Sequence, residues 1–212
     1  MDKNKLTNFF PYLLILIGAS ARLLPHAPNF TPIAALALFG AVYLRRRDSF
    51  WVPLVAMLLS DMLIGFYHPL IMVSVYGSFV LAGLIGIRLR RFRNVIPNQN
   101  LPRTEIRGRG SRNKKNQLQG WWPHVLGASL TSSMLFFLIT NWAVWAWGGL
   151  YPKTITGLMM SYWMALPFFR NTLLGDVFYA CLFFGIAECI SLWVRRRNSR
   201  MEVAENMNLI IR

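Results

Sequence analysis

Cysteine, histidine and acidic residues are scarce in this sequence. Its 212 residues include two cysteines, three histidines and eight acidic residues, against 23 lysines and arginines. Cys181 and Cys189 lie in one late apolar segment without a CxxC spacing, so the sequence indicates neither a disulfide framework nor a zinc site. It also contains no GxSxG, HExxH or Walker A motif and no paired-carboxylate spacing. We therefore expect a protein that is not an enzyme, and the sequence names no cofactor.

Apolar residues, in contrast, are abundant. They make up 55% of the chain, and the mean hydropathy is +0.38, which is high for a soluble domain of this size. Eight tryptophans, seven tyrosines and 15 phenylalanines suit a protein that is anchored at two lipid–water interfaces. Residues 1–21 have the basic-then-apolar pattern of a signal peptide, but they lack a convincing cleavage site and further apolar segments follow. These features predict an all-α, polytopic membrane helical bundle that retains its first apolar segment.

Six apolar segments divide the chain, and each is a candidate transmembrane helix. A crossing takes about 20 residues, within a range of about 17–25. The last three segments reach this length easily, the first and third only marginally, and the second is short. The small residues of the second segment suggest a helix buried among its neighbours, and five spans plus a re-entrant segment is the alternative. The segments are Phe9–Leu24, Pro32–Leu44, Phe50–Phe66, Leu70–Ile87, His124–Trp147 and Thr172–Val194.

The basic residues predict the orientation of these helices. Lysine and arginine accumulate in cytoplasmic connections, and 20 of the 23 basic residues lie at the termini or in connections that follow even-numbered segments. Six crossings with both termini in the cytoplasm satisfy every basic cluster. The longest basic stretch, residues 94–119, is expected to be a flexible cytoplasmic loop within a single membrane domain of residues 1–212. It would lie against anionic lipid and not bind nucleic acid.

This orientation places most of the other polar side chains on the extracytoplasmic side. They come from the three outer connections and the helix ends beside them, and prolines in the same connections suggest fixed loop shapes. One connection, RLLPHAPNFT at residues 22–31, combines an arginine, a histidine and an asparagine that a turn does not need. We therefore expect an outward-facing small-molecule pocket. The residues expected to line or brace it are Arg22, His26, Asn29, Asp61, Tyr76, Asn141, Tyr151, Arg170, Asn171 and Asp176.

Some of these residues also have a purely structural interpretation. An Arg22–Asp176 or an Arg170–Asp61 ion pair would lock helix ends without binding anything. A transition metal held by Asp61 with the two loop histidines is a further alternative, but their spacing matches no known metal signature.

The connection before the last helix is expected to be a long outer loop. It reads YPKTITGLMMSYWMALPFFRNTLLGD, at residues 151–176. Asn171 and Thr172 are the kind of residues that cap a helix start, so they are expected to begin the last helix.

Five stretches carry a resemblance to a known family. RLLPHAPNFTPIAALALFGA, LLSDMLIGFYH, TNWAVW, YPKT and PFFRNTLLGD are similar to a family of small bacterial inner-membrane proteins, described as transport proteins with a domain of unknown function. The resemblance covers most of the chain outside residues 94–119. It implies a multi-pass protein of the bacterial inner (plasma) membrane and names no reaction.

A more distant resemblance concerns the whole architecture. Six helices with cytoplasmic termini and three outer loops around a polar pocket resemble the substrate-binding S-components of energy-coupling-factor (ECF) vitamin transporters. That resemblance implies a scaffold membrane subunit and two ATPases as partners, which contact small-residue helix faces. The candidate faces here are Gly18, Ala19 and Ala21, or Ala37 and Ala41.

These observations lead to one expected function and two alternatives. We expect a membrane transport protein, namely the solute-binding subunit of a transporter, with the lipid bilayer and a small polar metabolite or vitamin as its partners. The mixture of arginines, carboxylates, amides and aromatic rings suits a polar or zwitterionic ring compound. The alternatives are an intramembrane enzyme and an assembly or scaffold protein, each with its active surface at the outer interface.

Overall fold

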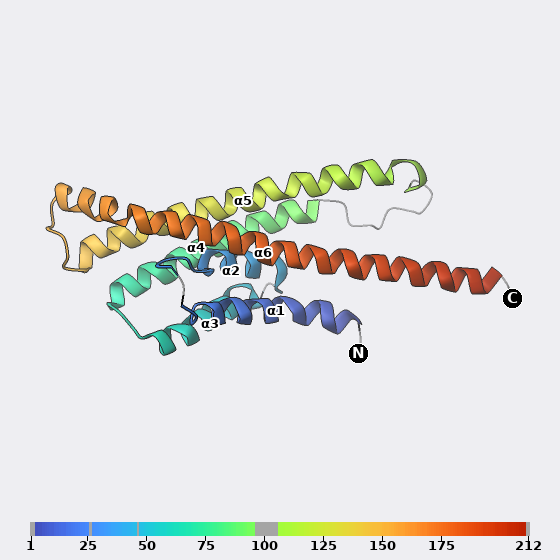
Figure 1. The fold of residues 1–212 in the computed structure, drawn as a ribbon, viewed down its shortest axis with the longest axis horizontal. Helices are drawn as coiled ribbons and strands as arrows, with labels where there is room; N and C mark the ends of the chain where they lie inside the picture. The colour runs from blue at the N-terminus through green and yellow to red at the C-terminus, as the bar shows by residue number, and fades with distance from the viewer. Residues whose placement is uncertain (1–2, 26, 46, 96–105, 211–212) are drawn as a thin grey trace.

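Six α-helices form the regular structure of the described part of this chain (Figure 1). The computed structural model describes residues 3–25, 27–45, 47–95 and 106–210, and within these residues it contains helices and no strand. The predicted all-α class is therefore confirmed. The helices are α1 (Lys3–Ala21), α2 (Ile33–Tyr43), α3 (Asp48–Ile64), α4 (Pro69–Val95), α5 (Ile106–Trp147) and α6 (Ile155–Ile210).

Helix α2 lies at the centre of the bundle. Nine of its 11 residues are buried, and it packs against all five other helices. A glycine on α4 makes the closest approach possible, because a Cβ added at Gly86 would lie 2.6 Å from the Ala41 Cβ and 3.0 Å from the Leu38 carbonyl oxygen. The predicted burial of the short second helix is therefore confirmed.

The small residues of α1 and α2 do not form an outward docking face. Ala37 and Ala41 are 2% and 0% exposed. Gly18 lies against the side chains of Leu36 and Phe183, where an added Cβ would be within 2.7 Å of each. Gly18, Ala19, Ala37 and Ala41 are therefore not open to a scaffold subunit, because the bundle uses them for its own packing.

Among the described residues, three helices are long and apolar enough to cross a membrane, not the six that the sequence suggests. They are the segments Pro69–Arg91 of α4, Trp121–Trp147 of α5 and Ile155–Val194 of α6. The apolar part of α1, Phe9–Ala21, and the whole of α2 are shorter. At 1.5 Å per residue α2 is about 16 Å long, only about half of the hydrocarbon core. The long last three segments are therefore confirmed, and six full crossings are not shown.

Helix α6 contradicts the predicted outer loop. It runs unbroken through Pro167, so residues 155–176 are helical. Leucine, methionine and alanine favour a helix in this stretch, and an apolar helix tolerates an interior proline where neighbouring groups satisfy the freed backbone. Asn171 and Thr172 consequently lie inside a helix and do not cap one. The Thr172 hydroxyl donates instead to the Phe168 carbonyl oxygen one turn earlier.

The predicted flexible loop at residues 94–119 is also largely helical. Helix α4 continues to Val95 and α5 begins at Ile106, whereas residues 96–105 lie outside the described residues. The arginines, lysines and glutamines at the start of α5 have good helix propensity. Figure 1 shows that this part of α5 and the last part of α6 extend beyond the compact bundle, at the end where α1 begins.

Candidate functional site

The connections α1–α2, α3–α4 and α5–α6 all lie toward the end of the bundle opposite the chain termini (Figure 1), and we call this the outer end. The predicted site residues near it have three different roles in the structure: an ionic network, a helix cap and the lining of a cavity. His26, the histidine of the α1–α2 connection, lies outside the described residues.

The ionic network joins α1, α3 and α4. The Arg22 guanidinium, one residue after α1, forms an ion pair with Asp61 of α3, with 2.7 Å between Arg22 Nη2 and Asp61 Oδ1. Arg22 Nη1 also donates to Ser60 Oγ and to the Met57 carbonyl oxygen. The Tyr76 hydroxyl of α4 donates to Asp61 Oδ2 at 2.8 Å. Asp61 is 2% exposed. Each of its two carboxylate oxygens accepts a hydrogen bond from another side chain, so this buried group is satisfied within the protein.

This network corrects the ion pairs expected from the sequence. Arg22 pairs with Asp61 and not with Asp176. Arg170 is exposed on α6 and makes no hydrogen bond or ion pair with the residues that the structure describes. In the connection after α3, partial burial and the nearby Asp61 carboxylate raise the pKa of Tyr67 to about 12. The phenol of Tyr67 therefore stays neutral at physiological pH. The nearby Arg22 and Asp61 carry opposite charges that neutralise each other.

Asp176 forms a helix cap. It is 2% exposed in the middle of α6, and its Oδ2 accepts a hydrogen bond from Ser133 Oγ of α5 at 2.7 Å. The backbone N–H groups of Ala34 and Ala35 bond to the same carboxylate. These groups belong to the first turn of α2, whose N-cap residue Pro32 offers no side-chain hydrogen bond. Asp176 therefore supplies from α6 the acceptor oxygens that the first turn of α2 lacks locally, and it joins α2, α5 and α6.

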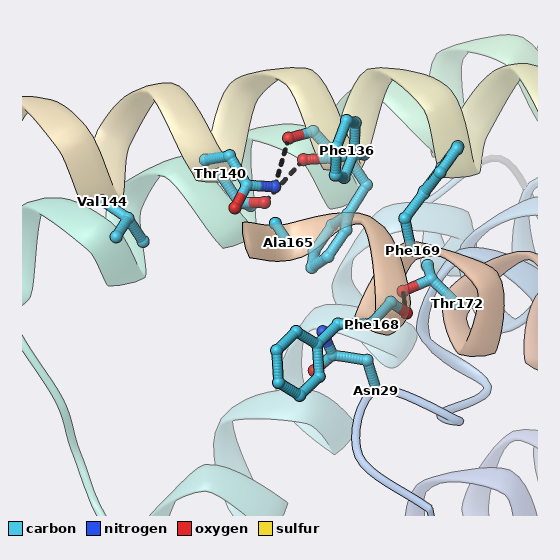
Figure 2. Close-up of a pocket in the computed structure, with 10 residues that line it drawn as sticks. Asn29, Phe136, Thr140, Val144, Ala165, Phe168, Phe169 and Thr172 are labelled. Atoms are coloured by element: carbon cyan, nitrogen blue, oxygen red, sulfur yellow. Dashed lines mark hydrogen bonds between the residues drawn. The ribbon is translucent and has the colours of Figure 1, made fainter. Parts of the chain in front are cut away.

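A cavity of ≈ 210 Å³ lies between the outer parts of α5 and α6 and the α1–α2 connection (Figure 2). Thr140 and Val144 of α5 lie on one side of it in this view, and Asn29 of the connection lies on the other, with Phe168 of α6. The residues that line it are Asn29, Phe136, Phe137, Thr140, Asn141, Val144, Ala165, Phe168, Phe169 and Thr172.

The lining combines aromatic rings with neutral hydrogen-bonding groups. None of the ten lining residues carries a charge. Asn141 donates through Nδ2 to the Phe137 carbonyl oxygen, and Thr140 donates through Oγ1 to the Phe136 carbonyl oxygen. Both bonds use donors, which leaves Asn141 Oδ1 and the lone pairs of the Thr140 hydroxyl as acceptors. Phe137 packs on Phe169 with 4.3 Å between ring centroids. The site therefore suits a small neutral molecule with a flat apolar part and hydrogen-bond donors.

The α1–α2 connection is held beside the cavity by its backbone and by α6. Asn29 has a φ of +61°, in the left-handed region that asparagine tolerates better than most residues. Asn171 of α6 donates through Nδ2 to the Pro28 carbonyl oxygen at 3.0 Å. Phe30 packs on Tyr179 of the same helix, with 5.7 Å between ring centroids. These contacts explain the asparagine of the connection, because they present Asn29 to the cavity.

The structure brings only some of the predicted residues to the cavity. Asn29 and Asn141 line it, and Asn171 braces the connection beside it. The predicted residues that lie outside the lining are Arg22, Asp61, Tyr76, Tyr151, Arg170 and Asp176.

Sequence reasoning missed the aromatic part of the cavity. A signal for it exists, because Phe137 and Asn141 on α5, and Phe168 and Thr172 on α6, are four residues apart and share a helix face. The expected loop over residues 151–176 hides the second pair, since a loop presents no fixed face.

Residues 2–199 match a family described as a family of unknown function, DUF6580. Neither the curated proteins nor the solved structures contain a match to this chain. The resemblance to a family without an assigned function is therefore confirmed. Its expected links to transport and to ECF S-components stay predictions.

Proposed function

We propose that this protein, which belongs to the DUF6580 family of unknown function, is a polytopic membrane protein that binds a small neutral metabolite as the solute-binding subunit of a transporter. The observation that carries the proposal is the cavity between α5, α6 and the α1–α2 connection. Concave sites with aromatic walls and a few placed polar groups are the usual form of small-molecule sites.

The outward faces of the shorter helices support a place in the bilayer for the whole bundle. Besides the three span-length helices, α1 exposes Leu13, Leu16 and Ile17, and α3 exposes Leu59 and Leu63, each between 40% and 74%. An apolar surface of this kind is a liability in water and suits lipid. Helix α2 is too short to cross alone, but the other helices enclose it, so it needs no contact with lipid. These features favour a bundle in which all six helices lie within the membrane.

The distribution of basic residues supports an extracytoplasmic position for the cavity. Three arginines connect α2 to α3, and further basic residues precede Trp121 in α5 and follow Val194 in α6. These segments lie toward the end of the bundle where the chain begins and ends, away from the outer connections (Figure 1). Because basic segments stay in the cytoplasm, the outer end and its cavity would face the outside, in bacteria the periplasmic side of the inner membrane.

The lining narrows the class of ligand. The sequence suggests a zwitterionic ligand, but such a compound has no charged partner among the lining residues. The charged residues Arg22 and Asp61 lie outside the lining and pair with each other. At ≈ 210 Å³ the cavity is smaller than the usual range of about 300–1,000 Å³ for ligand sites. A small neutral ring compound that donates hydrogen bonds to Asn141 and Thr140 fits both observations.

Mass spectrometry of small molecules extracted from the purified protein tests this proposal. Wild-type protein should release one metabolite in near-stoichiometric amount. Asn141→Leu keeps the side-chain volume and removes the amide, so it should lower the occupancy of that metabolite about tenfold, the expected effect of one lost hydrogen bond in a desolvated site.

A matched pair on α5 provides the control. The hydroxyls of Thr131 and Thr140 each donate to the carbonyl oxygen four residues earlier, and only Thr140 lines the cavity. Thr140→Val should therefore reduce occupancy, and Thr131→Val should not. Wild-type protein without a bound metabolite, or equal occupancy in both variants, would reject the site. A chemically altered product would indicate an enzyme, and a stoichiometric protein partner without a ligand would indicate a scaffold.

A further inference from the structure

We propose that the protein also binds an anionic phospholipid, with an acyl chain in an apolar groove between α1 and α3 and the phosphate at arginines near the end of that groove. The proposal rests on the membrane placement proposed above. It concerns a different surface from the outer cavity, so the two sites can be tested separately.

Polar contacts to α1 and to Arg22, the residue after it, hold both ends of α3. At one end the Tyr12 hydroxyl donates to Asp48 Oδ2. At the other end Arg22 pairs with Asp61. A groove of ≈ 340 Å³ lies between these two contacts and is lined by both helices. The polar contacts hold the helices in this arrangement, so the space between them is a fixed feature of the bundle.

The groove has a buried floor and exposed apolar walls. Ile15 is 1% exposed, whereas Leu16, Val55 and Leu59 are 48% to 59% exposed. Trp51, Val55 and Leu59 are four residues apart, so they form one ridge along about 12 Å of α3. In a bilayer such a groove is filled by hydrocarbon and not by water. Its apolar lining, which follows α3 for about 12 Å, suits part of one acyl chain.

One end of the groove is basic. Arg45 and Arg47 are exposed in the connection just before α3, and the charge of Arg45 is close enough to act on the Tyr12 hydroxyl. The acidic group at this end, Asp48, already accepts the hydrogen bond of Tyr12. Trp51 is 71% exposed in the first turn of α3, which is the kind of position where tryptophan lies at the headgroup level. Arginines beside an apolar groove at the cytoplasmic face complement the anionic lipids of the inner leaflet.

Native mass spectrometry of the full-length protein in detergent, with added phosphatidylglycerol or phosphatidylcholine, tests the proposal. Wild-type protein should retain one phosphatidylglycerol and bind phosphatidylcholine roughly 10- to 30-fold more weakly, because two arginines act on the anionic headgroup. Equal retention of the two lipids by wild-type protein would overturn the proposal.

Two pairs of variants separate the acyl-chain contact from the charge contact. Ala56→Trp fills the groove and should remove the bound lipid, whereas Leu58→Trp, on α3 but outside the lining, should not. Replacing Arg45 and Arg47 together by alanine should abolish the preference for phosphatidylglycerol. The same double replacement of Arg88 and Arg91, exposed on α4, should leave it intact.

The outcomes distinguish this site from the outer cavity. Lipid retention by Ala56→Trp equal to that of wild-type protein would overturn the groove as the site. If Ala56→Trp does not purify, the arginine variants alone decide whether an anionic lipid binds here, because they leave the packing of the groove unchanged. The metabolite is measured in the same samples. If wild-type protein carries phosphatidylglycerol but no metabolite, the outer cavity is rejected as a site and the lipid site is retained.

Discussion

The ionic network and the cavity lie toward the same end of the molecule and use polar side chains in opposite ways. In the network, Arg22 and Asp61 satisfy each other away from water. In the cavity, Asn141 and Thr140 are uncharged and keep acceptor positions free. A buried charge without a partner is far more costly than a buried amide or hydroxyl. The charged pair of the network therefore stabilises the bundle, whereas the neutral polar residues of the cavity remain able to bind a ligand.

Asp61→Leu should have the largest effect on stability, because it leaves Arg22 buried without its partner. We expect a loss of about 3–5 kcal/mol in the free energy of unfolding, as for other broken buried pairs. Arg22 Nε is already buried without a hydrogen-bond partner among the described residues, so the pair depends on its remaining contacts. Thermal unfolding in detergent, followed by tryptophan fluorescence, measures the loss.

The double variant Arg22→Met with Asp61→Leu sharpens that result. Replacing both charges by apolar groups removes the unpaired ion, so most of the lost stability should return. A double variant as unstable as Asp61→Leu alone would show that the network is not a self-contained pair.

Asp176→Ala should have an intermediate effect, about 1–3 kcal/mol, because it removes the cap of α2 and leaves its backbone donors unsatisfied. Asp176→Asn keeps an acceptor oxygen and should recover part of the loss. Thermal unfolding of both variants, with Ser133→Ala for the side-chain contact alone, separates the contributions. Equal losses for Asp176→Ala and Ser133→Ala would contradict a cap at α2.

Asn29 should show the smallest effect on stability and a clear effect on ligand. Asn29→Gly accepts the φ of +61°, so stability should hardly change while metabolite occupancy falls. Asn29→Ala should cost about 1–2 kcal/mol for its left-handed backbone. Unfolding curves and extracted metabolite, measured on the same preparations, test this split. Normal occupancy in Asn29→Gly would remove this side chain from the site.

Two of the candidates outside the lining, Arg170 and Asp176, were expected in a loop before the last helix. A loop over residues 151–176 puts Arg170 and Asp176 near the outer surface. A continuous α6 instead places Asp176 about 32 Å along the helix from its start, at 1.5 Å per residue. Composition alone does not reveal this continuity, because Pro167 and the polar residues after it are also typical of a helix boundary.

Two of the predicted asparagines, Asn29 and Asn141, do line the cavity, and this has a physical reason. An amide in an apolar bundle is costly to bury without a partner, so it marks a place where a hydrogen bond or open space is available. Their aromatic neighbours were not predictable in the same way, since phenylalanine is common throughout an apolar protein and only a known helix face distinguishes one ring from another.

Composition and the order of residues already determine that this chain is helical, which segments are most apolar and where the basic clusters fall. These properties depend on local preferences for helix, lipid and water, and each segment carries its own. Only the tertiary structure decides which groups meet. Arg22 reaches Asp61 across 39 positions, and Ser133 reaches Asp176 across 43. Contacts of that separation arise from the packing of whole helices, so no local pattern specifies which carboxylate closes an ion pair and which one caps a helix.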